Sequence, residues 1–161
     1  MFKKFKTSSV NINGIGRNST HKVQNFRQHM FRTDTHVGFV QETKSKSLPT
    51  SFLTAFPKTL FRTYINFASQ GAAIIINKTL LPDDKFEIEL SQSSSSSHIL
   101  QNLSISDENN NSLKFSHVYQ SPSLSLAPTL FKKITDFSPT LVLGDINETS
   151  HKKKQSATGT T

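Results

Sequence analysis

The sequence predicts an α/β (α+β) fold that opens with a strand–helix–strand unit and continues with antiparallel strands. Strand-like and helix-like apolar patterns alternate along the first part of the chain. Short apolar runs, separated by Gly, Asn and Pro turn signals, follow in the middle part. The length of 161 residues is enough for one domain, or for part of a larger one.

Residues 5–40 are predicted to form the opening strand–helix–strand unit. The first strand is expected over residues 5–12, and Ser19 or Thr20 can cap the helix that follows. A second strand is expected over residues 37–40. Strands joined by a helix run parallel, so the ends of both strands should lie on the same edge of the sheet. The helix carries an apolar stripe of Val23, Phe26, Met30 and Phe31.

The middle of the chain is predicted to form strands joined by turns. A loop bounded by Pro49 and Pro57 leads into them, and the polar residues 107–111 form a hairpin turn. The serine run at residues 93–97 is interpreted as a low-complexity loop. The strands are expected over residues 61–67, 72–77, 86–90, 98–105 and 113–119, the first two as a hairpin.

The last predicted elements are a second helix and a final strand. The helix lies near Pro128 and ends before Pro139, and residues 141–143 form the strand. The apolar residues of the helix are Leu126, Leu130, Ile134 and Phe137. We therefore expect a domain over residues 1–149 and a disordered basic tail over residues 150–161.

Charge and composition limit the classes of function. The formal net charge of +8 suits a polyanionic partner such as nucleic acid, or reflects only a basic surface and tail. The absence of cysteine excludes disulfides and thiolate metal sites. The sequence shows no secretory signal, and its longest apolar run is too short to cross a membrane. Lysines 152–154 suggest nuclear localisation or only solvated charge, so the location is nuclear or unknown.

Polar strings follow two of the predicted apolar strands. Gln-Glu-Thr at residues 41–43 follows one strand, and Gly-Asp-Ile-Asn at residues 144–147 follows another. A carboxylate flanked by amides at the end of a buried strand is a common source of metal and phosphate chemistry. Because the first two strands are parallel, Asn11 and Asn13 should lie beside Glu42. The two strand ends are therefore candidate halves of a metal and phosphate site.

One reaction that such a site could perform is phosphodiester hydrolysis, which needs charge neutralisation at the phosphate and an oriented water. A hard cation such as Mg²⁺, or alternatively Mn²⁺, supplies the first and prefers oxygen ligands. Glu42 is the candidate carboxylate ligand, and the alternative is a strand-end glutamate that faces solvent. Asn11 and Asn13 can coordinate the metal or orient its ligand, whereas ordinary turn chemistry is the alternative for both.

Taken in chain order, these strings resemble the endonuclease/exonuclease/phosphatase superfamily. The resemblance is strongest to the apurinic-like endonucleases of non-LTR retrotransposons, which commonly open with Asn-x-Asn-Gly. It covers residues 5–149 and implies an incomplete two-sheet α/β sandwich, with helices flanking the first sheet. The matching strings are residues 11–14, 41–43, 70–76, 117–119 and 144–147.

The resemblance also implies roles for three further residues. Asp145 would position or deprotonate the attacking water, and Asn147 would hold a phosphate oxygen. Tyr119 would contact the phosphate region, although the loop after it is one residue longer than in the family. Without the resemblance, Asp145 would be interpreted as an Asx-turn residue and Tyr119 as a half-buried sheet residue.

The family's second half supplies a late Ser-Asp-His string that this sequence does not show. His151 has no Asp before it, and the earlier histidines, His117 among them, are expected to be surface or structural residues. The resemblance therefore implies a truncated, Mg²⁺-dependent DNA endonuclease of retrotransposon type with weak or absent activity. The alternatives are a non-catalytic nucleic-acid-binding remnant and a functionless mobile-element fragment. Truncation should also leave one face of the first sheet uncovered and open to self-association.

Overall fold

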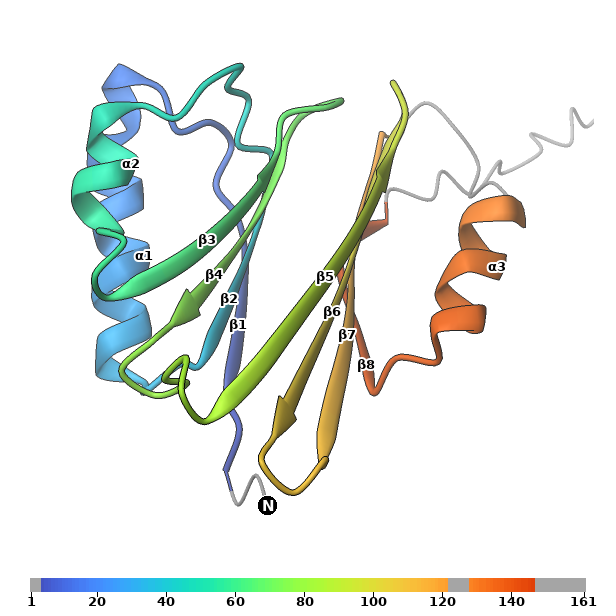
Figure 1. Ribbon diagram of the computed structural model, residues 1–161. Helices are drawn as coiled ribbons and strands as arrows, with labels where there is room; N and C mark the ends of the chain where they lie inside the picture. Colours follow the sequence, from blue (N-terminus) through green and yellow to red (C-terminus); the bar gives the residue numbers. More distant parts are fainter. Residues whose placement is uncertain (1–3, 122–127, 147–161) are drawn as a thin grey trace, which may run out of the picture.

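Two four-stranded sheets stack face to face, with the helices on their outer sides (Figure 1). This computed structural model describes residues 4–121 and 128–146. The first sheet has the order β1 (Thr7–Asn11), β2 (Val37–Gln41), β4 (Ala72–Asn77), β3 (Phe61–Asn66). The second has the order β5 (Phe86–Ser94), β6 (His98–Asp107), β7 (Ser112–Gln120), β8 (Leu141–Ile146). The helices are η1 (Arg17–Ser19), α1 (Thr20–Arg32), α2 (Thr50–Ala55) and α3 (Pro128–Phe137).

The opening β1–α1–β2 unit has the predicted parallel geometry. Asn11 pairs with Gln41, so the ends of β1 and β2 lie together. Helix α1 buries Val23, Phe26 and Met30 against the outer face of the first sheet. Phe31 was also predicted in this stripe, but it is 41% exposed and contacts Phe61 edge-on.

The main core lies between the two sheets. Strand β2 is buried along its whole length, because α1 covers its outer face and the second sheet covers its inner face. The expectation of an uncovered face on the first sheet is therefore wrong, since β5–β8 of the same chain pack on it. The core residues between the sheets are Val37, Phe39, Ile74, Ile76, Leu81, Leu103, Ile105 and Phe115.

Two segments predicted as loops take part in regular secondary structure instead. Helix α2 lies in the predicted loop between Pro49 and Pro57, where Phe52 and Ala55 are buried. Strand β5 extends to Ser94 and so takes up part of the predicted serine loop. The second helix begins at Pro128, and Leu126 lies outside the described residues, as does the predicted tail.

In the described part of the chain, β1 and β8 each lie at an edge of their sheet. Strand β1 forms one edge of the first sheet, and β8 pairs in parallel with β7 at one edge of the second. Three apolar residues of β8 are more than two-fifths exposed, namely Leu141, Val142 and Ile146. No helix among the described residues has the length and apolar character needed to cross a membrane.

Candidate metal and phosphate site

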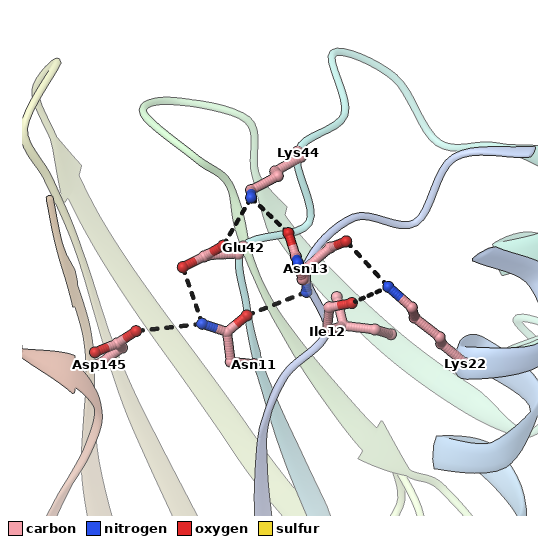
Figure 2. A network of polar contacts seen from close by, with 7 residues as sticks. All are labelled: Asn11, Ile12, Asn13, Lys22, Glu42, Lys44 and Asp145. Carbon is pink, nitrogen blue, oxygen red and sulfur yellow. Dashed lines mark hydrogen bonds and ion pairs between the residues drawn. The ribbon is translucent and has the colours of Figure 1, made fainter. Parts of the chain in front are cut away.

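Asn11 joins the two predicted halves of the site (Figure 2). Its side-chain Nδ2 donates to Oε1 of Glu42 at 2.9 Å and to Oδ2 of Asp145 at 3.2 Å. Glu42 directly follows β2 in the first sheet, whereas Asp145 lies in β8 of the second. The two carboxylates, more than a hundred positions apart in sequence, thus share one amide donor.

The loop after β1 is fixed by hydrogen bonds to its own backbone. The backbone N–H of Asn13 donates to Oδ1 of Asn11 at 3.1 Å. Lys22 on α1 donates to the carbonyl oxygens of Ile12 and Asn13, each at 3.2 Å. Asn11 therefore donates from its amide nitrogen to the two carboxylates and accepts at its amide oxygen from the loop. These bonds orient the carboxylates relative to the loop after β1.

The loop after β1 and the segment after β2 both have a strained backbone, and hydrogen bonds join the two. Asn13, Glu42 and Lys44 have φ angles of 48°, 54° and 47°, in the left-handed region that non-glycine residues rarely adopt. The N–H of Gly14 donates to the Glu42 carbonyl at 2.7 Å, and that of Ile15 to the Thr43 carbonyl at 2.9 Å. These bonds fix the direction in which the Glu42 side chain leaves the sheet.

Two glycines allow the close approaches that the site needs. Gly71 has a φ of 79°, and a Cβ there would collide with the Thr43 hydroxyl. Gly144 has a φ of 142°, and a Cβ there would collide with the Val118 carbonyl. Since Gly144 precedes Asp145, this contact seats β8 closely against β7 at the position of the carboxylate.

A lysine ammonium lies between two of the predicted metal ligands. The Nζ of Lys44 is 3.0 Å from Oε2 of Glu42 and donates to Oδ1 of Asn13 at 2.5 Å (Figure 2). The pKa of Glu42 is lowered, chiefly by the hydrogen bond from Asn11 and further by Lys44. Glu42 is thus held as a carboxylate, and its second oxygen already faces a cation.

Tyr119 lies beside the carboxylates and is almost fully buried. It is 2% exposed and pairs with Asp145 in the β7–β8 register. Burial raises the pKa of its phenol, and the negative charges of Glu42 and Asp145 raise it further. The hydroxyl therefore keeps its proton at neutral pH and can donate it to a hydrogen bond.

The donor set fits a hard divalent cation. Oε2 of Glu42 and Oδ1 of Asn13 already converge on the Lys44 ammonium, which stands in for a cation. Mg²⁺ is commonly held by one or two carboxylates and keeps several waters. Among residues 4–121 and 128–146, no three His, Cys, Asp or Glu side chains gather to hold a metal ion. Any cation here would therefore depend on amide oxygens and water for its remaining ligands.

Sequence reasoning missed one residue of this region, Lys44. It gave Lys44 no role, although only one residue separates this lysine from Glu42 in the sequence. For His117, expected to be a surface or structural residue, the structure supports the structural alternative, because the side chain is 1% exposed and hydrogen-bonded to Gln41. Asn147, the predicted phosphate ligand, lies outside the described residues.

Comparisons with known proteins identify the fold. No protein-family model matches the sequence, and no curated protein matches it. The structure resembles TDP2 from C. elegans, with a TM-score of 0.55 at 20% identity, covering 92% of this chain and 51% of that chain. A truncated C. elegans TDP2 gives a TM-score of 0.52 at 20% identity, covering 88% of this chain and 61% of that one.

A third similar solved structure is described by the name of a protein family. It is an endonuclease/exonuclease/phosphatase family protein from Leptotrichia buccalis, with a TM-score of 0.53 at 12% identity, covering 89% of this chain and 67% of that chain. The chain described here thus has the fold of the endonuclease/exonuclease/phosphatase superfamily, as an incomplete α/β sandwich. It spans about half the length of the first TDP2 chain.

Proposed function

We propose that the protein is a divalent-metal-dependent phosphodiester hydrolase whose turnover is weak or absent. The observation that carries the proposal is the amide of Asn11, which holds Glu42 and Asp145 together from two different sheets. Mg²⁺ is the proposed cation, with Mn²⁺ as an alternative. The superfamily fold supports the same class of chemistry.

Each residue of the site has a role that its position supports. Glu42 and Asn13 would hold the cation, which when bound would neutralise charge on a phosphate group. Asp145 would accept a proton from the attacking water, because it is a carboxylate joined to Glu42 through the Asn11 amide. The hydroxyl of Tyr119, which keeps its proton at neutral pH, would donate a hydrogen bond to a phosphate oxygen. Weak turnover follows from having only these two carboxylates in the described part of the site.

DNA is the proposed substrate, and the retrotransposon-type endonucleases are the proposed subgroup. The net charge of +8 supports a polyanionic partner, and the Asn-Ile-Asn-Gly string at residues 11–14 supports the subgroup. A nuclear location would accord with a DNA substrate. A nucleic-acid-binding remnant without catalysis is the second candidate, since the same charge supports binding alone.

Plasmid nicking tests the proposal directly. The full chain is incubated with supercoiled plasmid and Mg²⁺ or Mn²⁺, and Glu42→Gln and Asp145→Asn are compared with the wild type. Glu87→Gln on β5 and Asp136→Asn on α3 are matched controls, because both side chains lie outside the site. We expect nicking to fall by about tenfold to a hundredfold in the two site variants only.

Two results would argue against catalysis at this site. Nicking that persists unchanged in both site variants would show that the activity comes from elsewhere. Salt-sensitive DNA binding without nicking in the wild type would favour the binding remnant instead. A single-stranded oligonucleotide substrate, run in parallel, distinguishes a preference for duplex DNA from general phosphodiesterase activity.

A further inference from the structure

A row of polar side chains crosses the interface between the two sheets, and its middle is buried. Gln41 Nε2 lies 2.8 Å from His117 Nε2, and His117 Nδ1 lies 2.9 Å from Gln101 Oε1. These three residues are 3%, 1% and 0% exposed. The row continues to Ser9 at one end and Gln92 at the other, through bonds of 2.9 Å each.

The direction of every hydrogen bond in the row is consistent with one neutral form of His117. Gln101 Oε1 can only accept, so His117 Nδ1 carries the proton and donates it. Its bare Nε2 then accepts from the Gln41 amide, whose other N–H donates to Ser9. Burial lowers the pKa of His117 to about 3, so the ring stays neutral.

The row joins the strands that carry the site. Gln41 ends β2 and is followed directly by Glu42, whose backbone leaves the sheet in the left-handed region. His117 lies two residues before Tyr119 on the same face of β7. It pairs with Leu143 of β8, two residues before Asp145. The Gln41–His117 bond therefore links the strand leading to one carboxylate with the strands leading to the other.

Hydrogen bonds fix this link in a way that apolar packing does not. On the side away from the site, His117 packs edge-on against Phe39 at 5.3 Å between ring centroids. Apolar contacts such as this one are non-directional and tolerate a small slip of one sheet over the other. A slip at His117 would instead leave buried amide and imidazole groups without partners, which is strongly unfavourable.

On the basis of the proposed function, we propose that His117 is a positioning residue for the cation site. Through Gln41 it holds the end of β2, and hence Glu42, at a fixed separation from the strands that carry Tyr119 and Asp145. His117 touches neither cation nor substrate in this account. Its contribution is the geometry within which Asn11 reaches both carboxylates.

Two amide variants of His117 separate positioning from general stability. His117→Gln places an amide oxygen near the position of Nε2 and so keeps an acceptor for Gln41. His117→Asn places an amide nitrogen near the position of Nδ1 and keeps only the bond to Gln101. Each variant loses one buried hydrogen bond, so urea unfolding should show similar losses of stability. Gln92→Ala, at the exposed far end of the row, is the control.

Amide hydrogen exchange measured by NMR tests the positioning without any metal. The N–H groups of Gly14 and Ile15 donate to the Glu42 and Thr43 carbonyls and so report on the segment after β2. We expect their exchange to be about tenfold faster in His117→Asn, and close to wild type in His117→Gln and Gln92→Ala. Equal exchange of these amides in the two His117 variants would overturn the positioning role.

Mn²⁺ binding, followed by the EPR signal of the free ion, is the second measurement. We expect the affinity to fall about tenfold in His117→Asn and to be retained in His117→Gln. Equal loss of affinity in both variants would also contradict the inference. If the wild type binds no Mn²⁺, the proposed function fails, whereas the exchange of Gly14 and Ile15 still decides whether His117 positions the segment.

Discussion

Replacing Asn11 by Asp is the perturbation that most directly probes the shared donor. The change preserves the shape of the side chain but exchanges the amide nitrogen for a carboxylate oxygen. Glu42 and Asp145 then lose the hydrogen bonds of 2.9 and 3.2 Å that they accept from Asn11. They also gain a negative charge at nearly the same distances, so three carboxylates would meet at one point.

The expected loss of stability follows from these contacts. A hydrogen bond to a charged group contributes about 1.5–3 kcal/mol, and solvent screening at the exposed Asn11 reduces each to about 1 kcal/mol. Repulsion between unit charges about 4 Å apart in water adds about 1 kcal/mol for each carboxylate. Asn11→Asp should therefore destabilise the metal-free protein by about 2–4 kcal/mol. Asn11→Ala, which adds no charge, should lose about half as much.

The pH dependence of stability should reverse in sign. In the wild type the pKa of Glu42 is lowered, so its stabilising contribution is present above the unfolded pKa and is lost as the pH falls through the folded value. In Asn11→Asp the crowded carboxylates have raised pKa values, so stability should fall as the pH rises through the acidic range.

Urea unfolding at several pH values, with and without Mg²⁺, measures both effects. Mg²⁺ should restore part of the lost stability in Asn11→Asp, because a cation offsets the added charge. A metal-free Asn11→Asp protein as stable as the wild type at neutral pH would refute the reasoning. Such a result would mean that Asn11 does not hold the two carboxylates together.

Three further predictions follow from the structure. Lys44→Met should raise the affinity for Mn²⁺ about tenfold, because it removes the competing ammonium. Isothermal titration measures the Mn²⁺ affinity of this variant and of the matched control, Lys46→Met. Gly144→Ala should destabilise the protein by about 2 kcal/mol or more in urea, since its Cβ collides with backbone; unchanged stability would show that β8 can shift. Self-association should occur at the exposed β8 edge and be reduced by Leu141→Lys; a wild type that sediments as a monomer at every concentration would contradict this.

Local patterns were sufficient to predict much of the fold. The parallel β1–α1–β2 unit follows from the change between strand and helix periodicity, and the register of Asn11 with Gln41 confirms it. Helix α2 was missed because its six residues are too short to show a helical period. Strand β5 runs through serines because backbone pairing with β6, rather than side-chain character, keeps it extended.

The part of the site that depends on the ends of neighbouring strands was predictable from the sequence. The part that depends on tertiary contacts between the two sheets was not. The proximity of Asn11 to Glu42 followed from parallel strands alone. The approach of Asp145 followed only from the family resemblance, because it depends on how the second sheet stacks on the first. The burial of His117 depends on the same stacking, which no periodicity in the sequence encodes.

Paramagnetic broadening by Mn²⁺ tests the central claim that the ends of β1 and β2 form a cation site. Substoichiometric Mn²⁺ is added to the ¹⁵N-labelled chain, and amide signals are followed by NMR. We predict that the signals of Asn13, Glu42 and Asp145 broaden first, and that Glu42→Gln abolishes this selectivity. Broadening that begins instead at the acidic groove lined by Asp83 and Asp107, or spreads evenly over the surface, would contradict the account.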